Sequence, residues 1–188
     1  MFNLSNDTEL KEKEHVNEDV YDKDLLDRLL QDGDIDAFRE EFLSMHNYEQ
    51  SEYFEDTDEE KRQKIFEFLS PSEVADFFDH LDIDDEEYEE LFDNINANYA
   101  SHILEEMSYD NAVDILNELS KPKVASLLTL MNNEDANEIK ALLHYEEDTA
   151  GGIMTTEYLS LKSTTPVKEA LMHVKEQAPN AETIYVIF

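Results

Sequence analysis

Two aspartates that lie four residues apart offer the clearest chemistry in this sequence. Asp110 and Asp114 fall on a predicted helix, where this spacing places both carboxylates on one face. Such a pair repels by a few tenths of a kcal/mol, and a divalent cation would relieve that repulsion. Asp110 also falls in the first turn of the helix, where the helix dipole favours an anion. The alternative for each is a solvated surface carboxylate without a ligand.

The other chemically useful residue types form no known constellation. The six histidines show no His-Glu-x-x-His spacing, and the sequence has no cysteine, which excludes zinc–thiolate sites and thiol catalysis. No nucleophile elbow accompanies the serines, and three glycines cannot supply a phosphate-binding loop. We therefore predict that the chain is not an enzyme.

The charge balance excludes two classes of partner. The sequence has 48 Asp and Glu against 14 Lys and Arg, which gives a formal net charge of -34. Nucleic acid is not expected to bind, because phosphate recognition needs a basic patch. The sequence has no run of about 18 apolar residues, so we expect no direct insertion of this chain into a membrane. Such an acidic chain should be stabilised by salt or divalent cations.

The carboxylates are carried by a helical repeat. Apolar residues at i, i+3, i+4 and i+7 recur about every twelve residues, and a good N-cap residue precedes each copy. The caps are Asp58, Ser70, Asp84, Asn96, Ser108, Ser120 and Asn132. The pattern predicts helices over 59–69, 71–81, 85–95, 97–107, 109–119, 121–131 and 133–144. Equivalent stripe positions in four copies predict a buried core of Phe78, Leu104, Leu116 and Leu128.

Three further helices are predicted before the repeat. Four leucines lie on one face of 24–30, and Gly33 is expected to end that helix. Phe38 and Phe42 belong to the stripe of the second helix, and the region 48–55 predicts a short third. Helices of about ten residues are marginal alone and must pack on their neighbours. The three N-terminal helices and the repeat together therefore predict a solenoid-like stack of short helices, with a flattened bundle as the alternative.

The pattern changes after the pair Gly151 and Gly152. Residues 157–162 alternate like a strand, and a helix follows with Val167, Ala170, Leu171 and Val174 on its expected buried side. A second predicted strand occupies 183–188. One β-α-β unit cannot cover its own sheet, so we expect the remainder of this domain to be supplied from elsewhere.

The segment Glu146–Thr155, EEDTAGGIMT, is similar to the linker of the MgtE family of magnesium channels and transporters. Residues 181–185, AETIY, resemble the first CBS repeat of that family. The resemblance implies a mainly α fold, a right-handed superhelix of short helices followed by an incomplete α/β CBS unit. It also implies an acidic tail or first helix at 1–24, a helical domain at 25–145, a linker at 146–155 and a truncated CBS repeat at 156–188.

The function implied by this resemblance is regulatory. In the family, Mg²⁺ lies between the N-terminal domain and a CBS pair, through which two protomers form a homodimer, and it holds a transmembrane pore closed. The resemblance assigns Mg²⁺ ligands to Asp76, Asp110, Asp114 and the backbone carbonyl of Gly152. It places the chain on the cytoplasmic side of the cell membrane, and this chain alone would transport nothing.

Two other functions stay open at this point. A solenoid of this composition could bind a basic protein on its acidic face, as a structural adaptor. A CBS module could instead sense an adenine nucleotide. Selective binding of Mg²⁺, salt-sensitive capture of basic peptides, and binding of adenosine phosphates would distinguish the three.

Overall fold

The computed structural model describes residues 21–145, 149–151, 154 and 159–177, and the described residues form helices and no strands. The N-terminal helices are α1 (Lys23–Asp32), α2 (Ile35–Phe42), α3 (Asn47–Glu55) and α4 (Glu59–Phe68). The central helices are α5 (Pro71–Phe78), α6 (Asp85–Asn94), α7 (Ala97–Glu106) and α8 (Tyr109–Glu118). The last are α9 (Lys121–Leu130), α10 (Asn133–Leu142) and α11 (Val167–Gln177). No described helix has the length and apolar character needed to cross a membrane.

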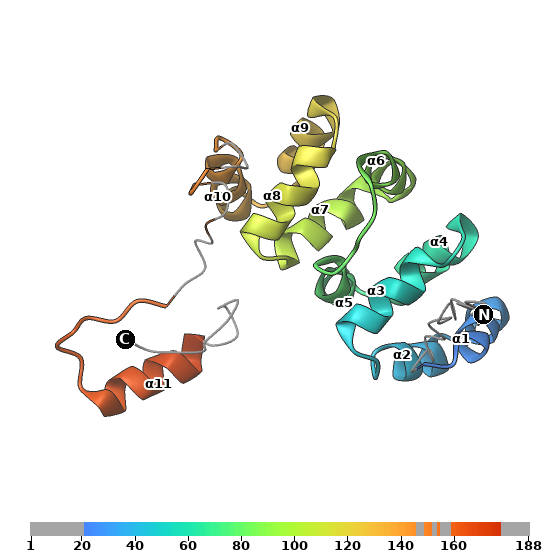
Figure 1. Cartoon of the computed structure of the whole chain (residues 1–188), viewed down its shortest axis with the longest axis horizontal. Coiled ribbons are helices and arrows are strands. Elements are labelled where there is room, and N and C mark those ends of the chain that lie inside the picture. Colours follow the sequence, from blue (N-terminus) through green and yellow to red (C-terminus); the bar gives the residue numbers. More distant parts are fainter. Residues whose placement is uncertain (1–20, 146–148, 152–153, 155–158, 178–188) are drawn as a thin grey trace, which may run out of the picture.

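The short helices stack so that most of them pack against the helix two places further along. α3, α5, α7 and α9 form one such series, while α6, α8 and α10 form another. At the N-terminal end, α1 packs against α2 and α4, and α2 packs against α4. Figure 1 shows α1 to α10 following one another along a curved row, with α11 lying apart from them. A stack of this kind buries a continuous core between neighbours, which a single ten-residue helix could not do.

The predicted helices of the repeat are confirmed, with ends that differ by a few residues. The largest difference is in α5, which ends at Phe78 rather than at residue 81. Asp79 and His80 instead form a tight turn, in which the His80 N–H donates to the Phe77 carbonyl at 3.0 Å. The N–H of Asp82 then donates to Glu55 of α3 at 2.8 Å, so a contact between helices sets the course of this loop.

The N-cap residues have the positions that the sequence predicts. Five of their side chains accept a hydrogen bond from the first turn of their own helix: Asp58, Ser70, Asp84, Asn96 and Asn132. Ser108 and Ser120 make no such bond. At α9 a carboxylate from another helix takes that place, because Glu89 of α6 accepts from the backbone N–H and the hydroxyl of Ser120, both at 2.8 Å. A negative charge at a helix N-terminus also suits the helix dipole.

The predicted core is confirmed at all four stripe positions. Leu104 is fully buried, Leu116 is 1% exposed, and Phe78 and Leu128 are also buried. At the N-terminal end the core is aromatic, with edge, tilted and stacked ring contacts among Phe38, Phe42, Tyr53, Phe54, Phe66 and Phe77. Gly33 ends α1 in the left-handed conformation, with φ of 73°, as predicted from its position.

The C-terminal segment corrects two predictions. Val167 is 76% exposed and Leu171 is 51% exposed, so the apolar stripe of α11 is not buried as expected. Residues 159–162 form no strand, and the rest of the predicted strand 157–162 lies outside the described residues. The predicted strand 183–188 lies wholly outside them. A strand needs a partner strand, and the apolar stripe of a helix needs a sheet to cover it. The exposed stripe of α11 and the missing strand at 159–162 therefore have the same cause, which is the lack of a sheet among the described residues.

Candidate metal-binding face

The structure places three of the four predicted ligands on two helices. Asp76 is exposed on α5, while Asp110 and Asp114 lie one turn apart on α8. Asp110 occupies the first turn of α8, as the sequence predicts. Gly152 lies outside the described residues, so the predicted contribution of its carbonyl stays a prediction.

Asp79 is close to both of these helices. It is the C-cap of α5, and it lines one hollow together with Asn111 of α8. Burial raises the pKa of Asp79, and repulsion from Asp110 and Asp76 adds to the rise, while the neighbouring Asn111 and His80 oppose it. Asp79 keeps enough surface in water for solvent to limit the shift. Carboxylates of α5 and α8 are therefore close enough to repel one another.

Asp110 carries an oxygen without a partner. Its Oδ1 atom is buried and accepts no hydrogen bond, although the residue lies in the first turn of a helix. A buried carboxylate oxygen is costly when unpaired, and oxygen is the ligand that Mg²⁺ prefers. The donor set on this face, which consists of carboxylates and an amide, therefore fits a hard divalent cation. Partial burial raises the pKa of Asp76, and repulsion from the neighbouring Glu73 adds to the rise.

The two helices border a hollow of about 220 Å³. Asp79, Asn111, Asp114 and Glu118 supply its polar lining, and Phe78, Leu81, Tyr88, Met107 and Ile115 supply the rest. Burial raises the pKa of Tyr88 to about 12, and the acidic residues around it, Glu55 and Glu118 among them, add to the shift. The potential inside the hollow is thus negative.

Sequence reasoning missed Asp79, Asn111 and Glu118. Asp79 is exposed, as is the neighbouring His80. A signal was present, because residues three apart on a helix share a face and Asp79 follows Asp76 by three. Asn111 gave no such signal, since only the fold brings it to the lining of the hollow.

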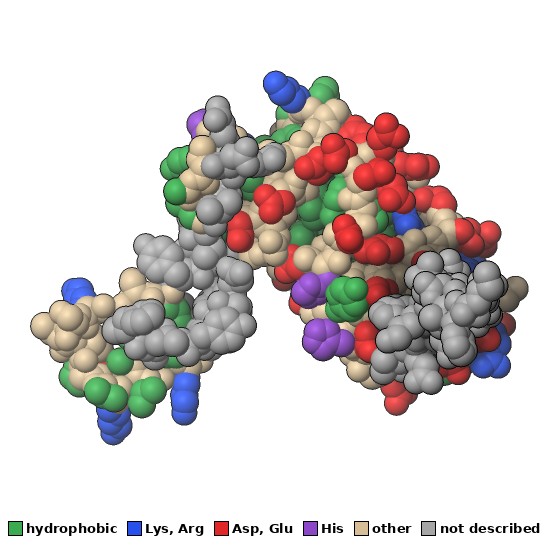
Figure 2. Space-filling model, viewed as in Figure 1, with side chains coloured by type: hydrophobic (Ala, Val, Ile, Leu, Met, Phe, Trp, Pro, Cys, Tyr) green, Lys and Arg blue, Asp and Glu red, His purple; other side chains and the backbone are tan. Residues whose placement is uncertain are grey.

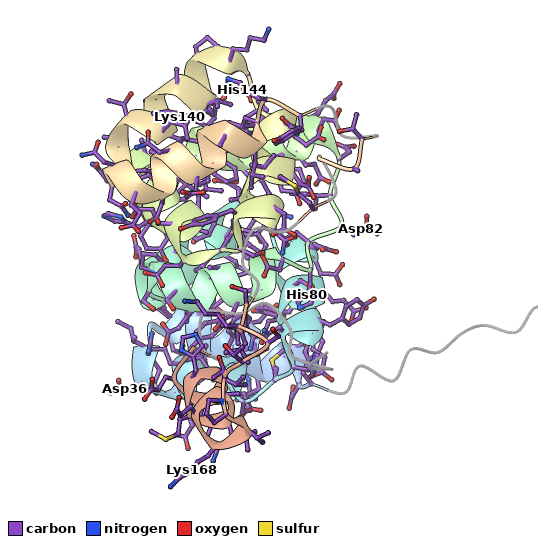
Figure 3. All side chains as sticks on the ribbon, turned by 90° about the vertical axis from the view of Figure 1, so that its left-hand side faces the viewer. Asp36, His80, Asp82, Lys140, His144 and Lys168 are labelled. Carbon is purple, nitrogen blue, oxygen red and sulfur yellow. The ribbon has the colours of Figure 1, made fainter. Side chains whose placement is uncertain are left out.

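Acidic side chains also cover part of the surface outside the hollow. Figure 2 shows acidic side chains crowded over α4 and α6, with few basic ones among them. α6 itself begins with Asp85, Glu86 and Glu87 in its first turn. The described histidines add no metal site. Figure 3 shows His80 and His144 well separated from each other.

No group of three or more histidine, aspartate or glutamate side chains in the described ranges has the geometry to hold a metal ion by itself. Asp110 and Asp114 therefore form part of a candidate site rather than a complete one. The face can supply carboxylate oxygens to an ion, and the remaining ligands must come from water or from other residues.

Comparisons with known proteins identify relatives of this chain. Residues 45–148 match the family model described as the MgtE intracellular N domain. A magnesium transporter MgtE of Enterococcus faecalis is 44% identical over 87% of this chain, and one of Thermus thermophilus is 33% identical over 87%. The chain spans 36% of the length of each of these two relatives.

Two solved structures are similar as well. One, the soluble part of a magnesium transporter, has a TM-score of 0.83 and 44% identity, and the match covers 87% of this chain and 64% of that one. The other is the cytosolic domain of the Mg²⁺ channel MgtE in complex with ATP, with a TM-score of 0.76 and 32% identity over 87% and 66% of the two chains. On the family model and these relatives together, the chain belongs to the MgtE family.

Proposed function

We propose that this chain is the magnesium-sensing regulatory part of a magnesium transporter or channel. The observation that carries the proposal is the face between α5 and α8, where carboxylates repel and one buried oxygen of Asp110 has no partner. Membership of the MgtE family indicates that the ion is Mg²⁺ and that the process is magnesium transport. The relatives are named magnesium transporters, which agrees with a role other than catalysis.

In this proposal the helices α1 to α10 are the N-terminal superhelix, and residues 156–188 are the start of a CBS unit. The partners are a CBS pair, through which two protomers form a homodimer, and a transmembrane pore. The chain then lies on the cytoplasmic side of the membrane. The exposed stripe of α11, with Val167 and Leu171, supports the CBS assignment, because such a helix needs further structure to cover it.

Asp76, Asp110, Asp114 and the carbonyl of Gly152 are the proposed ligands of Mg²⁺. Bound Mg²⁺ supplies positive charge that offsets the repulsion between carboxylates. The residues of this chain hold the acidic face in shape and present its oxygens to the CBS pair. At low Mg²⁺ the acidic surfaces repel, the N-terminal domain moves away from the CBS pair, and the pore is free to open.

The test is small-angle scattering of a longer chain that continues through the CBS pair, measured against Mg²⁺ concentration. We expect the parent protein to become more compact as Mg²⁺ rises, with little response to Na⁺ at matched ionic strength. The double substitution Asp110→Asn with Asp114→Asn should reduce that compaction without lowering fold stability, because it removes a repelling pair. Glu138→Gln, a change at an exposed position of α10, is the control.

Equal compaction of the double variant and the parent would show that these aspartates are only solvated surface. Compaction by Na⁺ as effective as that by Mg²⁺ would show general screening rather than a site.

A nucleotide-sensing function is the second candidate. It is favoured by one observation, the similarity to an MgtE cytosolic domain that was solved in complex with ATP. Calorimetric titration of the same longer chain with ATP, in the presence and absence of Mg²⁺, tests it. Absence of saturable heat in both conditions would remove this candidate.

A further inference from the structure

The first turn of α8 carries Asp110, but its own N-cap side chain does not hold it. Ser108 makes no cap hydrogen bond, whereas five other N-cap residues of the repeat do. A bond to another helix is present at this turn instead. The hydroxyl of Tyr109, the first residue of α8, donates to Oδ1 of Asp135 on α10 at 2.9 Å. The helices α8 and α10 also pack against each other, so the bond belongs to an established contact.

The acceptor of this bond, Asp135, is itself held at the start of α10. The side-chain amide of Asn132, the N-cap of α10, donates to Oδ2 of Asp135, so both carboxylate oxygens have a donor. The same amide of Asn132 donates to Oε1 of Glu105 on α7 at 3.2 Å. Tyr109 and Asp135 are half-buried, which limits the access of competing water. Tyr109 therefore ties α8 to a carboxylate that other contacts already orient.

The helix α10 also leads into the linker. Tyr145 lies just beyond the last turn of α10, and the backbone of Gly151 comes so close to its ring that a Cβ atom at position 151 would collide with that ring. The next residue in the sequence is Gly152, whose carbonyl is the fourth proposed ligand. The region of α10 therefore contacts both parts of the chain that carry the later ligands, the helix α8 and the linker.

We propose that Tyr109 and Asp135 are positioning residues, which fix the carboxylates of Asp110 and Asp114 on α8 relative to α10 and so to the linker that follows it. This inference rests on the proposed magnesium function. It adds two residues that act through the ligands and do not bind the ion themselves.

Two physical requirements make such a tether necessary. Mg²⁺ accepts little departure from octahedral geometry, so a small shift of α8 would misplace two of its ligands at once. The first turn of α8 is also the part of the helix most ready to shift, because Ser108 provides no cap bond and Asp110 and Asp114 repel each other. The bond from Tyr109 to Asp135 opposes both effects at the residue next to Asp110.

A double-mutant cycle tests this directly. Tyr109→Phe removes the hydroxyl and keeps the ring, while Asp135→Ala removes the acceptor, and neither change alters a proposed ligand. We expect each variant to weaken Mg²⁺ binding by about 10-fold, the lower end of what residues that orient metal ligands contribute. The double variant should bind Mg²⁺ no more weakly than either single variant, because the two side chains act through one bond.

The measurement is calorimetric titration with MgCl₂ of the longer chain that continues through the CBS pair, together with urea unfolding of the 188-residue chain. Tyr99→Phe is the matched control for the lost hydroxyl. It removes one hydrogen bond to the carbonyl of Leu69, at 2.8 Å, from α7, which carries no proposed ligand. Glu138→Gln is the control for the charge lost from α10. Tyr99→Phe should lower stability, and both controls should leave Mg²⁺ binding unchanged.

Unchanged Mg²⁺ binding in Tyr109→Phe would overturn the inference while the proposed function stands. An equal loss of binding in Tyr99→Phe would also overturn it, because general destabilisation would then explain the effect. Losses that multiply in the double variant would overturn it as well, since the two residues would then act independently. If the parent itself binds no Mg²⁺, the proposed function and this inference fall together.

Discussion

Arg39 of α2 and Glu73 of α5 face each other through two parallel hydrogen bonds. Nη1 of Arg39 donates to Oε2 at 2.7 Å and Nη2 donates to Oε1 at 2.5 Å. Nη1 also donates to the carbonyl of Phe68 at the end of α4, at 2.9 Å. Glu73 also forms the capping box with Ser70, so the Arg39–Glu73 ion pair connects α2 and α4 to the start of α5.

Glu73 should give the fold a defined sensitivity to acid. Partial burial opposes ionisation, but hydrogen bonds from Arg39 and Ser70 outweigh it and lower the pKa of Glu73 from 4.5 to about 2. A lowered folded-state pKa contributes stability that is complete above the unfolded value and is lost as pH falls through the folded value. The contribution should therefore disappear between about pH 4.5 and pH 2.

Glu73→Gln should lower the free energy of unfolding at pH 7 by about 1–3 kcal/mol. The difference from the parent should shrink as pH falls through this window. Urea unfolding at a series of pH values measures it, with Glu138→Gln on the exposed side of α10 as the control. A difference that stays constant down to pH 2 would show that the charge of Glu73 does not matter.

The core stripe makes a second prediction. Leu116 is 1% exposed, so Leu116→Ala should lower the free energy of unfolding by about 2–5 kcal/mol, the usual cost of truncating a core leucine. Leu130 is the matched control, because it is 38% exposed and loses less contact on truncation. Urea unfolding of both variants decides the point. Similar losses for both leucines would mean that the stripe does not form the core.

The caps make a third prediction. Oδ1 of Asn96 accepts from the N–H groups of Asn98 and Tyr99 at 3.0 and 3.3 Å, so Asn96→Ala should cost about 1 kcal/mol. Ser108 has the equivalent position before α8 but makes no cap bond, and its buried hydroxyl has no partner. Ser108→Ala should therefore be neutral or stabilising. Thermal unfolding of the two variants tests this contrast, and an equal loss in both would contradict it.

Repeat spacing and caps made the helices predictable, because both are local properties of the sequence. Asn96 indicates the start of α7 by its residue type alone, without reference to the rest of the fold. The apolar stripe that contains Leu104 indicates which face of that helix is buried. Contacts between helices were not predictable in this way. Arg39 and Glu73 are 34 positions apart, and no local pattern connects them.

Only part of the candidate site was predictable, because only part of it is a local pattern within one helix. Asp110 and Asp114 share one helix, so their spacing alone indicated a repelling pair. Asp79 follows α5 and Asn111 lies on α8, and only the folding of the chain brings both to the lining of one hollow. The helix α11 forms where the sequence predicts it, but its expected buried side is wrong at Val167, because burial of a stripe depends on packing and not on the pattern alone.

The last prediction concerns the charge of Asp79. Asp79→Asn removes a carboxylate that is repelled by Asp76 and Asp110, and it keeps a side chain of nearly the same shape. The variant should therefore be more stable than the parent at low ionic strength. In about 1 M NaCl the screening length falls to about 3 Å, and the advantage should nearly vanish.

Glu138→Gln removes the same unit of charge from an exposed position of α10, and it should give a smaller gain. Urea unfolding of the three proteins in low and high salt separates the two effects. If Asp79→Asn and Glu138→Gln gain equally, only the large net charge of -34 is being reduced. A larger gain at Asp79 that salt removes locates the repulsion on the face between α5 and α8, where a bound cation would act.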